Sequence, residues 1–392
     1  MTRRINHFCA SLLAVLLVGS SYHLLCTTNI SLYFSAEDGD PTAPRSSFDL
    51  VTHFLTPHTG KEVRMAMVEG SWAVYDLPEN IWNRNYTCRS GIRCSAMEIG
   101  ADESERLSEA DVILTLNPEP WWNESIANRA KTHLAFLGME GWDYDIDMDT
   151  VFDYKATVYG AKDDRHVWAT MSETPWAEML TPRAQLDWSK KSKDRNVMFM
   201  SSNSCPSHRS WFVEQLIEHG VDVWSLGTCA SSHETTDRVQ KLKQLCGDEA
   251  GWGAGDWRGP KNCLTEHFKF IISIEKQFED DYISEKFFHP FAVGTVPLYW
   301  GGLNVAHYNP GENSFVNVRD FGGDEPDIAA IAALLKRLNE NDAQYEEYFR
   351  WKQQKALRPE FGVVNYHSWK NLPCVMCEKR LGVDLGHLGS VL

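Results

Sequence analysis

Short apolar runs separated by turn residues occupy the first half of the chain. Val63–Val68, Asp111–Thr115 and His133–Leu137 have the length and the flanking residues of buried strands. A stretch rich in Ser, Glu and Ala precedes Asp111 and favours a helix. We therefore expect an α/β domain in this half.

Strand and helix patterns alternate more regularly in the second half. The predicted strands are Asn196–Ser201, Val221–Trp224, Lys269–Ile274 and Thr295–Tyr299, and the predicted helices are Ser207–His219, Ser284–Val293 and Asp327–Asn339. This alternation indicates a parallel sheet with crossover helices. Because ligands of such sheets bind beyond the carboxyl ends of the strands, we expect the chemistry after Leu137, Ser201 and Ile274.

The N-terminal residues have the pattern of a membrane-targeting segment. Arg3 and Arg4 precede an apolar run from Phe8 to Val18, which favours a cytoplasmic N-terminus and a lumenal remainder. A cleavable signal peptide needs only this run, whereas a spanning anchor needs roughly 20 largely apolar residues. Both alternatives stay open, and the lack of a clean small-residue cleavage site favours the anchor.

Composition suggests the domain boundaries. Residues 28–47 are rich in Ser, Thr, Asp, Gly and Pro and have the character of a stem, and the polar segment Thr181–Arg195 has that of a linker. The predicted units are a tail and signal-anchor over 1–27, the stem over 28–47, a first domain over 48–185, a second domain over 186–365 and a C-terminal segment over 366–392.

The charge balance excludes one class of partner. Acidic residues outnumber basic ones by 54 to 38, and no basic block is present, so nucleic acid is not an expected ligand. An anionic substrate is still compatible with this balance, because a few Lys and Arg side chains gathered in a cleft can reverse the local potential.

Cysteines and glycosylation motifs agree with a lumenal location. Eight of the ten cysteines follow the apolar segment, and an even number suits disulfides. The pair Cys374 and Cys377 forms a CxxC motif, but no second CxxC or HxxxH motif accompanies it, which favours a disulfide over a zinc or redox site. Candidate N-glycosylation sites are Asn29, Asn85 and Asn123.

The segment after Ile274 has features of an anion site. A loop leads from this strand to a helix that opens near Ser284, and the free N–H groups of a helix N-terminus suit a diphosphate. Lys286 in the first turn opposes the helix dipole, and a bound anion would remove that objection. The alternative is a solvated lysine on a surface turn.

Specific residues in this segment match a known signature. The order Phe268-Lys-Phe270, Ile274-Glu275, Asp281-Tyr-Ile-Ser-Glu-Lys286 and Gly294-Thr-Val-Pro297 closely resembles the pattern FKFxLAFENSxxxDYxTEKxxxxxxxGTVPVxxG of the α1,3/4-fucosyltransferases. Two positions depart from it, since Lys276 replaces an Asn that helps to hold the donor in the family and Ser284 replaces the commoner Thr. The change at Lys276 removes that Asn contact to the donor, and Ser284 keeps the hydroxyl.

The resemblance implies a GT-B fold, in which two Rossmann-like α/β domains face a cleft and GDP-fucose binds to the second domain. In the family, the residues matching Lys286 and Arg209 contact phosphate and the residue matching Glu285 contacts the ribose. The implied donor-binding residues are Arg209, Glu275, Tyr282, Glu285 and Lys286, and Tyr159 and Asn203 are candidate donor or acceptor contacts.

The same resemblance implies an inverting reaction with a base in the first domain. Gly138-Met-Glu140-Gly141 resembles the family's Asn-Phe-Glu-Ser, so Glu140 is the expected catalytic base. The acidic run Asp143–Asp149 contains DxD patterns that can hold a divalent cation, but it lies far from the donor segment in the sequence. We expect a solvated loop there, no essential metal and at most stimulation by one.

We therefore expect an α1,3-fucosyltransferase that acts on a GlcNAc of a glycoprotein glycan. The expected location is the Golgi membrane, as a single-pass type II protein with a lumenal catalytic domain, although the endoplasmic reticulum is an alternative. A protein O-fucosyltransferase and a silent glycan-binding or chaperone module are the alternative functions. The resemblance also pairs Cys88 and Cys94 with Cys374 and Cys377, so that the C-terminal segment returns to the first domain.

Overall fold

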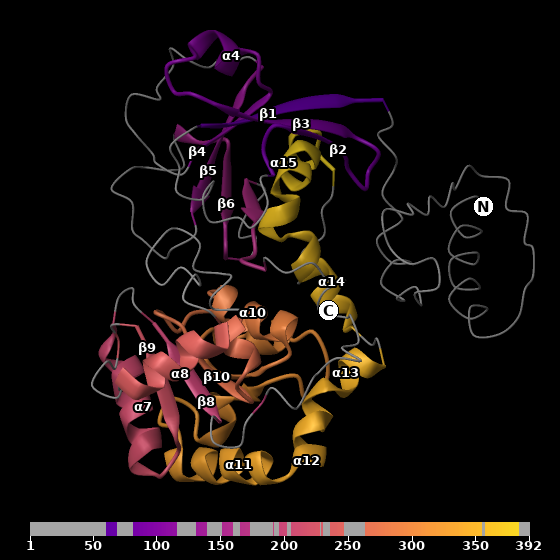
Figure 1. The fold of residues 1–392 in the computed structure, drawn as a ribbon. Helices are drawn as coiled ribbons and strands as arrows, with labels where there is room; N and C mark the ends of the chain where they lie inside the picture. Colours follow the sequence, from indigo (N-terminus) through magenta and orange to yellow (C-terminus); the bar gives the residue numbers. More distant parts are fainter. Residues whose placement is uncertain are drawn as a thin grey trace, which may run out of the picture. The chain divides into compact units, whose positions relative to one another are not determined.

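The computed structural model describes residues 60–68, 81–115, 131–138, 151–159, 165–172, 191, 196–201, 205–227, 229, 236–246, 263–354 and 357–383. All of them belong to the compact unit Thr42–Leu392 and form two sheets with surrounding helices (Figure 1). The predicted signal-anchor and stem lie outside these residues. None of the helices in the described ranges combines the length and the apolar composition of a membrane span.

The first sheet has seven strands in the order β2-β3-β1-β4-β5-β6-β7. They are β1 (Glu62–Val68), β2 (Arg84–Thr87), β3 (Arg93–Ile99), β4 (Val112–Thr115), β5 (His133–Gly138), β6 (Tyr154–Thr157) and β7 (His166–Trp168). Every neighbouring pair is parallel except β2 with β3. Val63 and Met65 of β1 pack into one core, whereas Ala66 and Val68 pack into another, so apolar residues cover both faces of the sheet.

The second sheet has five parallel strands in the order β12-β11-β10-β8-β9. They are β8 (Val197–Met200), β9 (Val223–Leu226), β10 (Phe270–Ile274), β11 (Val296–Trp300) and β12 (Val316–Asn317). Followed in chain order, this is a doubly wound arrangement in which the direction of winding reverses between β8 and β10. A reversal of this kind leaves a crevice at the carboxyl ends of the two strands, where ligands commonly bind.

Helices follow or connect these strands. The α-helices are α4 (Ser104–Ser108), α7 (Ser207–Glu218), α8 (Thr236–Cys246), α10 (Glu285–Val293), α11 (Ile328–Glu340), α12 (Asp342–Glu346), α13 (Arg350–Gln353), α14 (Pro359–Tyr366) and α15 (Leu372–Arg380). Short 3₁₀ helices are η5 (Val305–Tyr308), η6 (Val318–Phe321), η7 (Glu347–Phe349) and η8 (Trp369–Asn371). The two parallel α/β sheets confirm the predicted fold class, whereas the facing cleft of a GT-B arrangement and the anchor stay predictions.

The structure places most of the predicted elements within one or two residues. The predicted strand Val221–Trp224 shows the largest of these offsets, because β9 spans Val223–Leu226. Val221 instead donates its amide hydrogen to the carbonyl of Leu216 and completes the end of α7. Lys191 in the predicted linker is buried and donates to the carbonyl of Phe268 at 2.6 Å, so this residue packs against the second sheet.

The C-terminal helix α15 packs against the first sheet. Leu372, Val375 and Met376 are buried in the same core as Val63 and Met65 of β1. The last described part of the chain therefore completes the core of a sheet that begins more than 300 positions earlier in the sequence.

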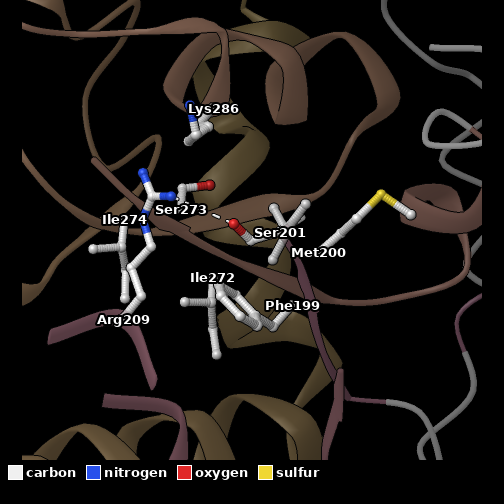
Figure 2. Close-up of a pocket in the computed structure, with 9 residues that line it drawn as sticks. Phe199, Met200, Ser201, Arg209, Ile272, Ser273, Ile274 and Lys286 are labelled. Carbon is white, nitrogen blue, oxygen red and sulfur yellow. Dashed lines mark hydrogen bonds between the residues drawn. The ribbon is translucent and has the colours of Figure 1, made fainter. Parts of the chain in front are cut away.

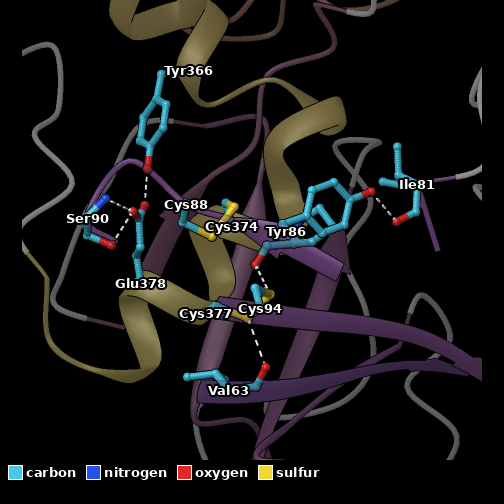
Figure 3. Close-up of a disulfide and its surroundings, with 11 residues drawn as sticks. Val63, Ile81, Tyr86, Cys88, Ser90, Cys94, Tyr366, Cys374, Cys377 and Glu378 are labelled. Atoms are coloured by element: carbon cyan, nitrogen blue, oxygen red, sulfur yellow. Dashed lines mark hydrogen bonds between the residues drawn. A yellow bond between two sulfur atoms is a disulfide. The ribbon is translucent and has the colours of Figure 1, made fainter. Parts of the chain in front are cut away.

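Two disulfides attach α15 to this sheet (Figure 3). Cys374 is bonded to Cys88, and Cys377 is bonded to Cys94, which confirms the pairing between the N-terminal cysteines and the CxxC motif. Two further disulfides, whose partners the sequence left unassigned, are Cys205–Cys229 and Cys246–Cys263.

A buried carboxylate lies beside these bridges. Glu378 of α15 has no exposed surface, and its Oε1 accepts hydrogen bonds from Ser90 N at 3.0 Å and Ser90 Oγ at 2.6 Å. The hydroxyl of Tyr366 donates to the other carboxylate oxygen (Figure 3). The carboxylate thus joins α15, α14 and the β2–β3 turn through polar contacts that water does not reach.

Candidate functional site

A pocket lies at the carboxyl ends of β8 and β10, where the second sheet reverses its winding (Figure 2). It is lined by Phe199, Met200, Ser201, Arg209, Ile271, Ile272, Ser273, Ile274 and Lys286. Ser201 and Ile274 are the strand ends after which chemistry was expected. The structure also brings together Arg209 and Lys286, the two cations that the sequence assigned to phosphate contacts.

Arg209 supplies a fixed positive charge. It lies in the first turn of α7, is only 3% exposed, and donates from Nη1 to Ser201 Oγ at 3.4 Å. The Cys205–Cys229 disulfide ties the residues before α7 to the segment after β9. Because a guanidinium keeps its proton in proteins, this buried side chain stays charged.

Lys286 supplies the second positive charge, from the first turn of α10. Its ammonium donates to Glu285 Oε1 and to Ser284 Oγ, both at 3.1 Å, and 31% of its side chain is exposed. Burial alone would lower the pKa of Lys286, but the carboxylates of Glu285 and Glu275 outweigh that effect and raise it above the ordinary value. Lys286 is therefore a permanent cation at neutral pH.

Glu275 lies directly behind Lys286 and is fully buried. Its Oε1 accepts from Ser284 N at 2.8 Å, its Oε2 accepts from Ser284 Oγ at 2.7 Å, and Tyr299 donates to Oε1 at 3.4 Å. The distance from Lys286 Nζ to Glu275 Oε2 is 3.8 Å. The pKa of Glu275 is raised by burial, and the charge of Lys286 and the hydrogen bonds of Ser284 counteract this increase.

The remaining predicted residues fall into two groups. Tyr282 is buried against the core of the first sheet, and Tyr159 donates from its hydroxyl to Glu279 Oε2 at 3.0 Å in the loop after β10. Asn85 is exposed on the edge strand β2, as a glycosylated residue must be. The predicted residues outside the described part of the chain are Asn29, Asn123, Glu140 and Asn203.

The sequence did not reveal what Asp281 does. Asp281 has a positive φ of 66°, and its Oδ1 accepts hydrogen bonds from Asn304 Nδ2 at 2.7 Å and Tyr308 Oη at 2.8 Å. Its own amide donates to Asn304 Oδ1 at 2.8 Å. These bonds fasten the loop that precedes α10. The sequence feature that could have indicated this role is the pair Asp281-Tyr282 within the quoted signature.

Gly301 matters because of how closely its backbone approaches the site. A Cβ at this position would lie 2.3 Å from Tyr299 Oη and 2.4 Å from Glu275 Cγ. We expect Gly301→Ala to displace both groups, to destabilise the protein by about 1–3 kcal/mol and to abolish ligand binding in the pocket. Thermal melting and nucleotide titration measure the two effects.

Gly302→Ala is the graded control for this change. The added Cβ would meet the flexible end of Ile283 at 3.0 Å and a backbone oxygen at 3.1 Å, so a smaller loss is expected. Equal tolerance of both substitutions would contradict the assigned close contact.

Among the described residues, one group has metal-ligand spacing: Cys246, Cys263 and His267. The sulfur atoms of Cys246 and Cys263 are bonded to each other, so they are not thiolate ligands here. The DxD patterns at Asp143–Asp149 lie outside the described ranges. The pocket itself presents Arg209 and Lys286, which suit an anion rather than a cation.

Comparisons with known proteins agree with this chemistry. Residues 189–382 match the family model described as glycosyltransferase family 10 (fucosyltransferase), C-terminal. An alpha-(1,4)-fucosyltransferase of Arabidopsis thaliana is 25% identical over 320 residues, which cover 81% of this chain and 72% of the relative. The human GDP-fucose protein O-fucosyltransferase 3 is 31% identical over 156 residues, but these are 40% of this chain and only 29% of that protein.

A crystal structure of an alpha1,3-fucosyltransferase with GDP-fucose overlaps 74% of this chain and 82% of its own, at 15% identity and a TM-score of 0.46. The family model, in contrast, covers the whole second sheet, the pocket and the helices that follow. The chain is a glycosyltransferase that belongs, through these residues, to family 10, the fucosyltransferases.

Proposed function

We propose that the chain is an inverting α1,3-fucosyltransferase that takes L-fucose from GDP-fucose and transfers it to a GlcNAc of a glycoprotein glycan. The observation that carries the donor assignment is the convergence of Arg209 and Lys286 on one pocket at the switch point of the second sheet. Two cations beside a helix N-terminus match the charge of a diphosphate. The family membership supports fucose as the transferred sugar.

The proposed reaction is a single displacement at the anomeric carbon of fucose. The acceptor hydroxyl attacks this carbon as the bond to the diphosphate breaks, the hydroxyl proton passes to a base, and GDP leaves with the bonding electrons. Arg209 and Lys286 stabilise the charge that develops on the diphosphate. Glu140 is the proposed base, and an essential metal is not expected because the two cations already neutralise the leaving group.

A protein hydroxyl is the second candidate acceptor. The similarity to the human O-fucosyltransferase 3 favours it, since the identity there is higher, at 31%, than to the plant enzyme, at 25%. The matched part of that relative is short, and the acceptor is therefore the point that an experiment must decide.

The four disulfides of the described residues support the proposed lumenal location. Disulfides persist in the oxidising secretory pathway and are rare in the cytosol. A Golgi type II topology with the anchor in residues 1–27 is our proposal for how the enzyme reaches that compartment.

The test is transfer of labelled fucose by the purified full-length chain. GDP-fucose is supplied with N-glycans that carry core or terminal GlcNAc units, with lactosamine and with folded protein acceptors, in the presence of EDTA. Transfer to a glycan that Glu140→Gln abolishes supports the main proposal, and labelling of protein hydroxyls instead supports the second candidate. A chain that binds neither GDP-fucose nor GDP refutes the donor assignment.

A further inference from the structure

Glu275 is placed beside the pocket but cannot reach a ligand in it. Its side chain has no exposed surface, and its oxygens face Ser284 and Tyr299. Its backbone carbonyl also accepts a hydrogen bond from His208 Nε2 at 3.0 Å, on the helix that carries Arg209. A buried charged group that is held from several sides acts on its neighbours rather than on a ligand.

Ser284 connects Glu275 to Lys286 through hydrogen bonds to both residues. A hydroxyl has one hydrogen to donate and two lone pairs to accept with. The hydrogen of Ser284 is directed to Glu275, so the lone pairs face Lys286, whose backbone N lies at 3.3 Å and whose Nζ lies at 3.1 Å from Ser284 Oγ. The carboxylate thereby fixes the direction in which the hydroxyl accepts.

We propose that Glu275 and Ser284 form a positioning pair that holds the ammonium of Lys286 at the pocket in the geometry that a nucleoside diphosphate requires. Neither side chain is a ligand of the donor. Glu275, which the sequence placed among the donor-binding residues, is therefore a positioning residue in this proposal. The inference rests on the proposed donor role of this pocket. A cation already fixed in place loses less side-chain entropy when the diphosphate binds.

The protein contains a matched site without this function. Glu378 also has no exposed surface, and it too accepts from the amide and hydroxyl of one serine, Ser90, and from a tyrosine hydroxyl. Ser90 and Ser284 are 1% and 2% exposed. The Ser90 site joins α15 to the first sheet and does not line the pocket. Removing the Ser90 hydroxyl therefore measures how much stability is lost when such a buried hydroxyl is deleted.

The experiment compares Ser284→Ala, Ser284→Thr and Ser90→Ala in the full chain. GDP is the probe, its Kd is measured by calorimetric titration, and thermal melting reports stability. We expect both alanine variants to melt earlier than the unmodified protein. Only Ser284→Ala should weaken GDP binding, by about tenfold, because one oriented hydrogen bond to the cation is lost. Ser284→Thr retains the hydroxyl and should restore the affinity.

Two results would overturn the positioning role while GDP still binds the unmodified protein: equal affinity in Ser284→Ala, or equal weakening in Ser284→Ala and Ser90→Ala. An unmodified protein that does not bind GDP overturns the donor proposal and this one with it. If Ser284→Ala fails to fold, Ser284→Cys keeps the volume but accepts hydrogen bonds poorly, and a Kd unchanged in that variant refutes the pair.

Discussion

Removing both disulfides of α15 should destabilise the protein by more than twice the cost of removing either one alone. Cys88–Cys374 and Cys94–Cys377 close nearly the same loop, with sequence separations of 286 and 283 residues. Once one bridge exists, the second closes only a short additional ring, which contributes about 3 kcal/mol to global stability. The bridge that remains closes the long loop and contributes about 5 kcal/mol.

Urea unfolding of the two single-bridge variants and of the double variant, all with Ala in place of Cys, measures this coupling. The first bridge removed should cost about 3 kcal/mol whichever is chosen, and the second about 5 kcal/mol. Removal of Cys205–Cys229, which spans 24 residues elsewhere in the chain, is the control and should be additive with either. Additive costs for the two α15 bridges would show that they act independently.

Lys286→Ala should reduce fucose transfer by at least about 100-fold, the usual loss when one group that stabilises developing charge is removed. The reason is that Lys286 is one of two cations lining the pocket and carries its charge throughout the neutral range. Its ion pair with Glu285 is partly exposed, with 31% and 23% of the side chains accessible, so its contribution to stability is small. Steady-state transfer and GDP titration measure the loss.

Lys336→Ala is the matched control, because Lys336 is exposed on α11 away from the pocket. It should leave both the rate of transfer and the affinity for GDP unchanged. Transfer by Lys286→Ala at a rate near that of the unmodified protein would remove the assigned role, and an equal loss in both variants would point to a nonspecific effect of charge.

Strands with continuous apolar runs could be predicted, and strands without them could not. Phe270–Ile274 is buried along its whole length and stands out in the sequence, as does Val296–Trp300. Arg93–Ile99 mixes charged, polar and apolar residues, and Arg84–Thr87 is an exposed edge strand. Their pairing depends on β1 and on the disulfides, which no local pattern records.

The sequence predicted the two cations of the candidate site but not the residues that hold the site in place. Arg209 and Lys286 are 77 positions apart, and only the expectation that strand ends meet at one edge, together with the family signature, joined them. The role of Asp281 in fastening its loop depends on Asn304 and Tyr308, whose side chains meet it only in the folded chain. The burial of Glu275 likewise depends on packing. From the sequence alone, a charged residue directly after a strand is expected at the surface.

The return of α15 to the first sheet also means that the core of this sheet is completed late in synthesis. Val375 and Met376 belong to the same core as Val63 and Met65, so the sheet made first by the ribosome lacks part of its interior until the chain is almost complete. The strands of the second sheet span residues 197–317, and the buried residues of its core end at Phe349, so this core is complete before Val375 and Met376 are made. Domains usually mature from the N-terminus onward. Here the later sheet can mature first, because Cys88 and Cys94 of the first sheet cannot form their native bridges until Cys374 and Cys377 have been made.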